Sequence, residues 1–198
     1  SASPRRVELL RQLGLPFEQI VSPVEEPPPQ GSDAESWALL SARAKATAVA
    51  ELILRDSTLS AAATSRLVIG ADTVVSCAGQ LLGKPESDAD AARMLHLLSG
   101  RWHTVCTGII VTASDGEYSA VEVTRVQMIR LSAAAIAGYV ASGEPSGKAG
   151  SYAIQGLAAR FVERVDGCYY NVVGLPLVRL CCLLESAGYD LDPPQDME

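Results

Sequence analysis

Two long runs rich in β-branched residues, 102–112 and 118–130, constrain the fold of this sequence more than any other feature. The turn residues 114–116 between them predict an antiparallel hairpin. An earlier run with a tight turn inside it, 67–84, predicts a second hairpin. Segments with helical periodicity lie before, between and after these strands. We therefore expect an α/β fold in which an elongated mixed β-sheet is flanked by helices.

Helical periodicity and capping residues mark the segments outside the sheet. The sequence predicts a short strand over 17–21 and helices over 4–13, 34–54, 88–98, 133–140 and 176–187. In the second of these helices the residues that recur at helical spacing are Trp37, Leu40, Ala44, Ala48 and Leu52.

Composition limits the class of protein. A chain of 198 residues, 48% of them hydrophobic, predicts one globular domain over 1–190 and a frayed tail over 191–198. No apolar run approaches the roughly 18 residues that span a bilayer, and no signal peptide is present, so we expect a soluble, cytoplasmic protein without a membrane partner. The net charge of −7 argues against binding a nucleic acid polymer. A small phosphorylated ligand needs only a few converging cations.

Cysteine and histidine usage disfavours several kinds of site. The five cysteines are scattered without metal-ligand spacing, so we expect reduced, mostly buried thiols. With only His96 and His103 in the chain, a zinc site or a Ser-His-Asp triad is difficult to assemble. We expect structural roles for both histidines.

The first six residues, S-A-S-P-R-R, have the features of an anion site. Ser3 is a good helix N-cap, and Pro4 suits the first helical position, where no backbone donor is needed. Arg5 and Arg6 then lie where the helix dipole is positive, which is unfavourable unless an anion binds there. Phosphate is the expected ligand. The alternative is a solvated start to a surface helix.

Three further charged residues have unusual surroundings. Asp72 lies inside an apolar strand, where an unpaired carboxylate would be costly to bury, so it is either a satisfied structural acid or a working group. Lys84 lies between a glycine and a proline, and Lys148 lies in a glycine-rich segment. Either lysine by itself is typical of a solvated surface.

Taken in order and spacing, these segments resemble the Maf family of nucleotide pyrophosphatases from residue 1 to about residue 185. The motifs are S-A-S-P-R-R, E-E, A-R-A-K-A, G-A-D-T-V-V, G-K-P, L-S-G-R-W-H-T-V-C-T-G, G-E-P-S-G-K-A-G-S-Y-A-I-Q-G and N-V-V-G-L-P-L. The resemblance implies a fold like that of inosine triphosphatases, with a central cleft between two lobes, and often a homodimer. It also implies metal-dependent hydrolysis of a nucleoside triphosphate to the monophosphate and pyrophosphate.

The resemblance also assigns roles to residues of the cleft. Asp72 resembles the family's proton acceptor, and it would serve equally as a ligand of Mg²⁺ or Mn²⁺. Glu26 matches the family acid of its loop and is the second candidate metal ligand; oxygen ligands suit either ion. Lys84 is the third candidate catalytic residue. The residues expected around the triphosphate are Ser3, Arg6, Lys45, Lys84 and Lys148.

Within the family, the form Y-A-I-Q-G resembles the branch that acts on dTTP and UTP. Arg5, Thr73 and Gln155 match positions linked with substrate choice. A glutamine amide can donate to O4 of thymine or uracil and accept from N3–H. Flipped, the same amide suits cytosine, so a second group must fix its orientation.

The sequence departs from the family pattern at three places. An apolar strand precedes the first motif in the family, so we expect one central strand to be missing here. Gly147 stands where aspartate is usual, and Ala153 replaces a common glycine.

Two other functions stay open: a catalytically silent nucleotide-binding or regulatory module, and a pyrophosphatase for methylated or purine nucleotides. The family domain also occurs fused to a methyltransferase-like domain, which would lie outside this chain.

Overall fold

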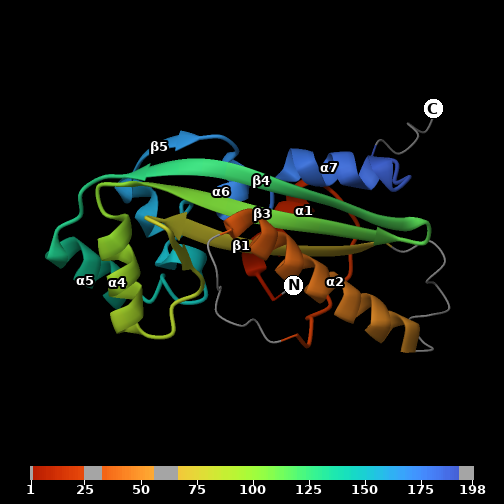
Figure 1. The fold of residues 1–198 in the computed structure, drawn as a ribbon, viewed down its shortest axis with the longest axis horizontal. Coiled ribbons are helices and arrows are strands. Elements are labelled where there is room, and N and C mark those ends of the chain that lie inside the picture. Colours follow the sequence, from red (N-terminus) through yellow and green to blue (C-terminus); the bar gives the residue numbers. More distant parts are fainter. Residues whose placement is uncertain (1, 25–32, 56–66, 192–198) are drawn as a thin grey trace.

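The computed structural model describes residues 2–24, 33–55 and 67–191. Figure 1 shows an elongated molecule in which a long sheet carries helices along its length and at one end. In chain order the elements are α1 (Pro4–Gln12), α2 (Ala34–Arg55), β1 (Val68–Cys77), β2 (Gln80–Leu82), α4 (Asp88–Leu98), β3 (Trp102–Ala113), β4 (Gly116–Met128), α5 (Ala133–Ala141), η2 (Ala149–Ser151), η3 (Leu157–Phe161), β5 (Val162–Asp166), α6 (Tyr169–Val173) and α7 (Leu177–Ser186).

The five strands form one sheet in the order β2-β1-β3-β4-β5, and each of these pairings is antiparallel. Both predicted hairpins, β1–β2 and β3–β4, are present, which confirms the expected α/β class. Among the described residues, β2 pairs with β1 only over Val75–Cys77. The 68–74 portion of β1 therefore lies at an edge of the sheet, and that edge carries Asp72 and Thr73.

Helix α2 packs across one face of the sheet through a stripe of small residues. Its fully buried positions include Ala38, Ala42 and Ala46. The two leucines that helped to predict the helix lie elsewhere, because Leu40 is 62% and Leu52 is 39% exposed. The period was therefore right, but the buried face is the alanine stripe. Short side chains let the helix backbone approach the strands closely, and longer ones would hold it away.

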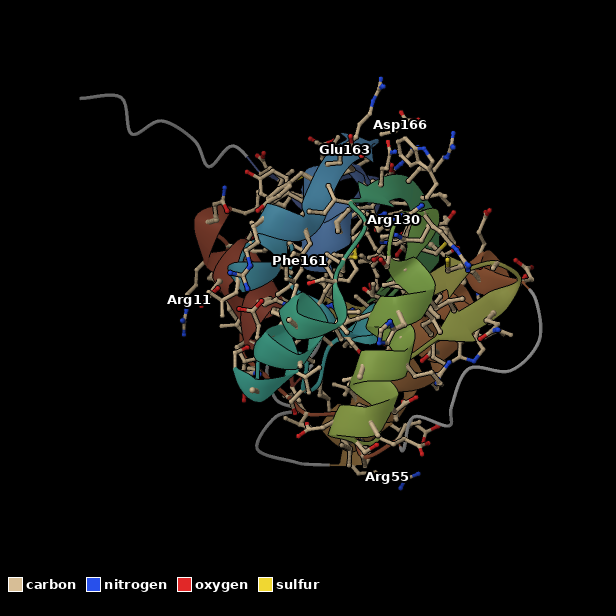
Figure 2. The ribbon with its side chains drawn as sticks, turned by 90° about the vertical axis from the view of Figure 1, so that its left-hand side faces the viewer. Arg11, Arg55, Arg130, Phe161, Glu163 and Asp166 are labelled. Atoms are coloured by element: carbon tan, nitrogen blue, oxygen red, sulfur yellow. The ribbon has the colours of Figure 1, made fainter. Side chains whose placement is uncertain are left out.

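The opposite face carries the larger part of the core. Leu9 of α1, Ile109 of β3 and Leu180 of α7 belong to one buried cluster there. Helices α4 and α5 close one end of the molecule, which Figure 2 views from that end. At this end lies Phe161, which Figure 2 labels. Its ring meets that of Tyr139 edge to face, with centroids 5.3 Å apart.

Local predictions differ from the structure in two places. Residues 17–21, predicted as a strand, have no regular secondary structure. Ser3 occupies the N-cap position of α1, but its side chain makes no capping hydrogen bond. By contrast, Ser87 caps α4 by accepting from the Asp90 amide, as expected. The predicted tail lies outside the described residues from 192 onward.

One finding bears on the expected absence of a membrane partner. Across the described residues, none of the helices has both the length and the apolar character needed to cross a membrane.

Candidate functional site

A pocket of about 420 Å³ opens beside the edge of β1. Its walls come from the start of α1, the middle of β1, the segment after β2, the 146–155 segment and the end of α6. Eight residues that the sequence predicted for the site line it: Ser3, Arg5, Arg6, Asp72, Thr73, Lys84, Lys148 and Gln155. The two exceptions are Lys45, which lies behind Asp72, and Glu26, which falls outside the described residues.

Asp72 is a buried acid with a charged partner. The residue is 5% exposed, and its Oδ1 lies 2.6 Å from Nζ of Lys45, which α2 contributes. Removing a carboxylate from water is costly without such a partner. The structure places Lys45 against this carboxylate, and its expected contact with the phosphates stays a prediction. Asp72 is thus a satisfied acid that also faces the pocket.

Arg6 forms hydrogen bonds to two separate segments of the pocket wall. Its Nε donates to the Gly174 carbonyl at 2.7 Å, Nη1 to the Ala71 carbonyl at 2.9 Å, and Nη2 to Thr73 Oγ1 at 2.9 Å. Within the described residues no strand pairs with the 68–74 portion of this edge of β1, and Arg6 satisfies the carbonyl of Ala71 there. The guanidinium therefore joins α1, β1 and the end of α6, and it orients the site as well as lining it.

Thr73 belongs to a polar cluster on the other face of β1 from Asp72. Successive side chains of a strand point to opposite faces, so Asp72 meets α2 while Thr73 meets Arg6. Oγ1 of Thr73 lies 2.8 Å from Oγ1 of Thr107, its partner across the β1–β3 ladder. Thr107 is fully buried. The hydroxyl of Thr73 is therefore held between two neighbours at the pocket wall.

Arg5 and Lys148 bring two positive charges into the same pocket. Burial lowers the pKa of Arg5, and its Nε donates to the Val173 carbonyl at 3.3 Å. The pKa of Lys148 is lowered by burial first and by the charge of Arg5 second. Two cations that disfavour each other in a part-buried pocket favour an anion between them. This electrostatic arrangement is what a phosphate group requires.

The segments that carry Lys84 and Lys148 are tied to each other. The amide of Gly150 donates to the carbonyl of Gly83 at 3.0 Å. The two lysines are 64 positions apart in the sequence, yet this bond places their segments in one wall of the pocket. A backbone hydrogen bond thus fixes the two segments from which the lysine side chains extend.

A divalent metal ion such as Mg²⁺ needs oxygen donors that converge on one point. The described part of the chain holds no group of three or more His, Cys, Asp or Glu side chains arranged to bind a metal. Asp72 contributes the carboxylate among the described residues that line the pocket. Mg²⁺ commonly binds through one or two carboxylates together with substrate phosphates and water. The described residues fit an ion that arrives with a phosphorylated substrate, with Glu26 still a predicted second ligand.

Two groups near the pocket had no assigned function in the sequence. Tyr152 lines the pocket, and its hydroxyl lies 2.8 Å from Nε2 of His103. Glu144 contacts the segment that carries Gln155. No local pattern marks either contact: Tyr152 and His103 lie 49 positions apart, and Glu144 accepts from amides 13 and 14 positions further along the chain. His103 is buried, as its expected structural role requires.

We expect the free energy of unfolding to decrease on acidification because of His103. The residue is 3% exposed, and burial lowers its pKa from 6.5 to about 4. Between these two values the unfolded chain binds the proton and the folded chain does not. Stability is therefore retained above pH 6.5 and lost as the pH falls toward 4, by up to about 1.4 kcal/mol per pH unit.

Urea denaturation at several pH values between 4 and 7.5 checks this expectation. In His103→Gln the free energy of unfolding should depend less steeply on pH over that range. His96→Gln is the matched control, because His96 is exposed on α4 and should leave the dependence intact. An unchanged slope in His103→Gln would assign the acid sensitivity to other groups.

Fold and site together define an α/β protein with a cation-lined pocket at the edge of its sheet. The family model described as "Maf-like protein" matches residues 1–187. The chain belongs to this family, as the motifs indicated.

Named relatives extend the match over nearly the whole chain. A dTTP/UTP pyrophosphatase of Pelotomaculum thermopropionicum is 49% identical over 96% of this chain and 96% of its own length. A protein of the same name from Methylobacillus flagellatus is 43% identical over 99% of this chain and 94% of its own. Another, from Salmonella typhimurium, is 46% identical over 93% and 89% respectively.

Proposed function

We propose that this chain is a nucleoside triphosphate pyrophosphatase that hydrolyses dTTP and UTP to the monophosphate and pyrophosphate. The observation that carries the proposal is the gathering of Arg5, Lys84 and Lys148 in one pocket with the buried carboxylate of Asp72. Relatives that are 43–49% identical and named dTTP/UTP pyrophosphatase support the choice of substrate.

The proposed chemistry takes place at the α-phosphate. A water oxygen forms a bond to the α-phosphorus, the bond from that phosphorus to the bridging oxygen breaks, and pyrophosphate leaves with the bond's electrons. Asp72 accepts the proton of the attacking water; its alternative role, left open by the sequence, is that of a residue that would hold the metal ion. Mg²⁺ or Mn²⁺, held by Asp72 and Glu26 with substrate oxygens, would supply charge neutralisation and a more acidic water.

The cations stabilise the charge that develops on the leaving pyrophosphate. Lys84, Lys148 and Arg5 line the pocket, where a part-buried setting strengthens their attraction for phosphate oxygens. Arg6 keeps α1 and the edge of β1 in place around them. The two lysines and Arg5 thus bind the phosphates, whereas Arg6 positions α1 and the edge of β1.

Gln155 is the residue proposed to recognise the base. Its side chain is exposed and lines the pocket, so its amide is available to a pyrimidine edge. Because the amide suits uracil in one orientation and cytosine in the other, selectivity depends on how firmly the residue is held.

Incubation with a panel of triphosphates tests the proposed function. The panel contains dTTP, UTP, CTP, GTP, ATP and 7-methyl-GTP, each with Mg²⁺, with Mn²⁺ or with a chelator, and pyrophosphate is measured. We expect turnover of dTTP and UTP that requires the metal. Nucleotide binding without hydrolysis would support the silent module, and preference for a purine or methylated nucleotide would overturn the substrate assignment.

We expect Lys84→Ala to lower kcat/KM for UTP roughly 30-fold to 1,000-fold. This factor corresponds to a loss of about 2 to 4 kcal/mol of transition-state stabilisation. The reason is the loss of one fixed cation from the pocket wall. Arg11→Ala is the control, because Arg11 lies on the outer side of α1 and points into solvent in Figure 2. Steady-state kinetics of both variants test this expectation. Equal kcat/KM values for Lys84→Ala and Arg11→Ala would show that Lys84 does not take part in the reaction.

The homodimer and the cytoplasmic location expected from the sequence stay predictions. Light scattering on the purified chain at micromolar concentration tests the first of these.

A further inference from the structure

The carboxylate of Glu144 binds the segment that carries Gln155. Its Oε2 accepts from the Leu157 amide at 2.9 Å, and its Oε1 accepts from the Ala158 amide at 3.3 Å. Burial raises the pKa of Glu144, but these two bonds, together with a hydrogen bond from Tyr139 and the charge of Lys148, outweigh burial and lower the pKa below its ordinary value, so the group is ionised at neutral pH. A charged acceptor with two backbone donors holds the chain just after Gln155 in one position.

Tyr139 extends the same contact to the other side of Gln155. Its hydroxyl donates to Glu144 Oε1 at 2.7 Å and accepts from the Ala153 amide at 3.2 Å. The residue is fully buried on α5, and burial together with Glu144 raises the pKa of the phenol, so it stays a donor. Glu144 and Tyr139 thus hold positions 153, 157 and 158, with Gln155 between them.

The backbone of the segment leaves room for this carboxylate. A Cβ added to Gly156 would lie 2.6 Å from Cδ of Glu144, closer than real Cβ contacts. Glycine at this position therefore permits the acid to approach.

Glu144 also lies on the loop that brings a cation into the pocket. Lys148 is four residues further along the chain. Burial and the charge of Arg5 lower the pKa of Lys148, and the charge of Glu144 raises it. One short loop therefore contacts the Gln155 segment and presents a phosphate-binding lysine. Displacing the carboxylate would disturb the base-reading segment directly.

We propose that Glu144 is a positioning residue for pyrimidine selectivity, which rests on the function proposed above. It does not touch the substrate. It fixes the backbone on both sides of Gln155, with Tyr139, so that the amide of Gln155 meets the uracil or thymine edge in one orientation. A loosely held Gln155 would turn its amide and accept cytosine, because the donor and acceptor of the amide simply exchange places.

Glu144→Gln is the first test, since it keeps the shape but presents an NH₂ group to neighbouring donors. We expect the preference for UTP over CTP, measured as the ratio of kcat/KM values, to fall about tenfold, through a higher KM for UTP with kcat within about twofold. Tyr139→Phe, which removes one hydroxyl, should lower the same ratio about threefold. Glu185→Gln, at an exposed acid on α7, is the control and should leave the ratio unchanged.

A second readout does not depend on catalysis. Amide hydrogen exchange without nucleotide should become faster at Leu157 and Ala158 in Glu144→Gln, while exchange in β3 keeps its rate. Slow exchange at both amides in the variant would overturn the anchoring role, whatever the enzyme's activity.

The outcomes separate this inference from the proposed function. If the wild-type chain hydrolyses none of the triphosphates, the proposed function is wrong, and hydrogen exchange alone decides whether Glu144 holds the segment. If the wild-type chain prefers UTP and Glu144→Gln keeps that preference, the inference is wrong while the function stands. Equal losses for UTP and CTP in both variants, with lower melting temperatures, would show a structural role only and would also overturn it.

Discussion

Replacing Asp72 with asparagine is expected to lower kcat/KM for UTP by about 10³-fold or more and to leave the fold intact. The amide has the same shape and its oxygen can still accept from Nζ of Lys45, which lies 2.6 Å from the carboxylate. It can neither take a proton from water nor neutralise a metal ion. The proposed chemistry therefore loses its central group while the packing around β1 is kept.

The control for this variant is Asp166→Asn. Asp166 is an exposed acid, and its nearest cation, in Arg125, lies 3.9 Å away, so the change should alter neither activity nor stability. Pyrophosphate release gives the activity, and near-ultraviolet circular dichroism with a thermal melt reports the fold. An Asp72→Asn protein that fails to fold, with no separate loss of activity per folded molecule, would make Asp72 a purely structural acid.

The largest expected effect on stability is that of Gly108→Ala. An added Cβ would lie 2.5 Å from the Ala38 carbonyl oxygen and 2.7 Å from Cα of Leu39, both backbone atoms of α2. A helix backbone cannot move aside as a flexible side chain can. We expect the free energy of unfolding to fall by about 3 kcal/mol, and the melting temperature by roughly 6 to 12 °C.

Gly138→Ala is the matched control for that change. Gly138 lies exposed within α5, and nothing is within 4 Å of the position of its added Cβ. Alanine favours a helix over glycine by about 0.5 to 1 kcal/mol, so this variant should be slightly more stable. A Gly108→Ala protein that melts with the wild type would mean that α2 packs less closely on β3 than the structure shows.

The hairpins and most helices were predictable because their signals are local. Turn residues at 78–79 and 114–116 end one strand and begin the next, and Ser87 and Ser132 cap the helices that follow them. Such signals need only a few neighbouring residues. The segment 17–21 has a strand-like composition, but no neighbouring strand pairs with it among the described residues.

The buried face of α2 shows where a local pattern is insufficient. Leucines usually mark the inner face of a helix, yet here Leu40 points outward and Ala38 and Ala42 point inward. The reason lies on the sheet, where Gly70 and Gly108 leave room for the helix backbone. The sequence of α2 alone does not contain that information.

The candidate site divides in the same way. The resemblance to the Maf family implied that Arg5, Asp72, Lys84 and Gln155 belong to one cleft, and they line one pocket. The roles of individual partners were not predictable. Lys45 pairs with Asp72, and Glu144 holds the Gln155 segment, because the folded chain brings distant positions together.

The sequence by itself determined the α/β class, the two hairpins and the set of charged groups available to a phosphorylated ligand, since periodicity, turn chemistry and charge are properties of short segments. Only the tertiary structure decided which of these groups contact each other. The bond from Arg6 to the Gly174 carbonyl joins residues 168 positions apart. Such contacts depend on how the elements pack, and packing is a property of the whole chain rather than of any segment.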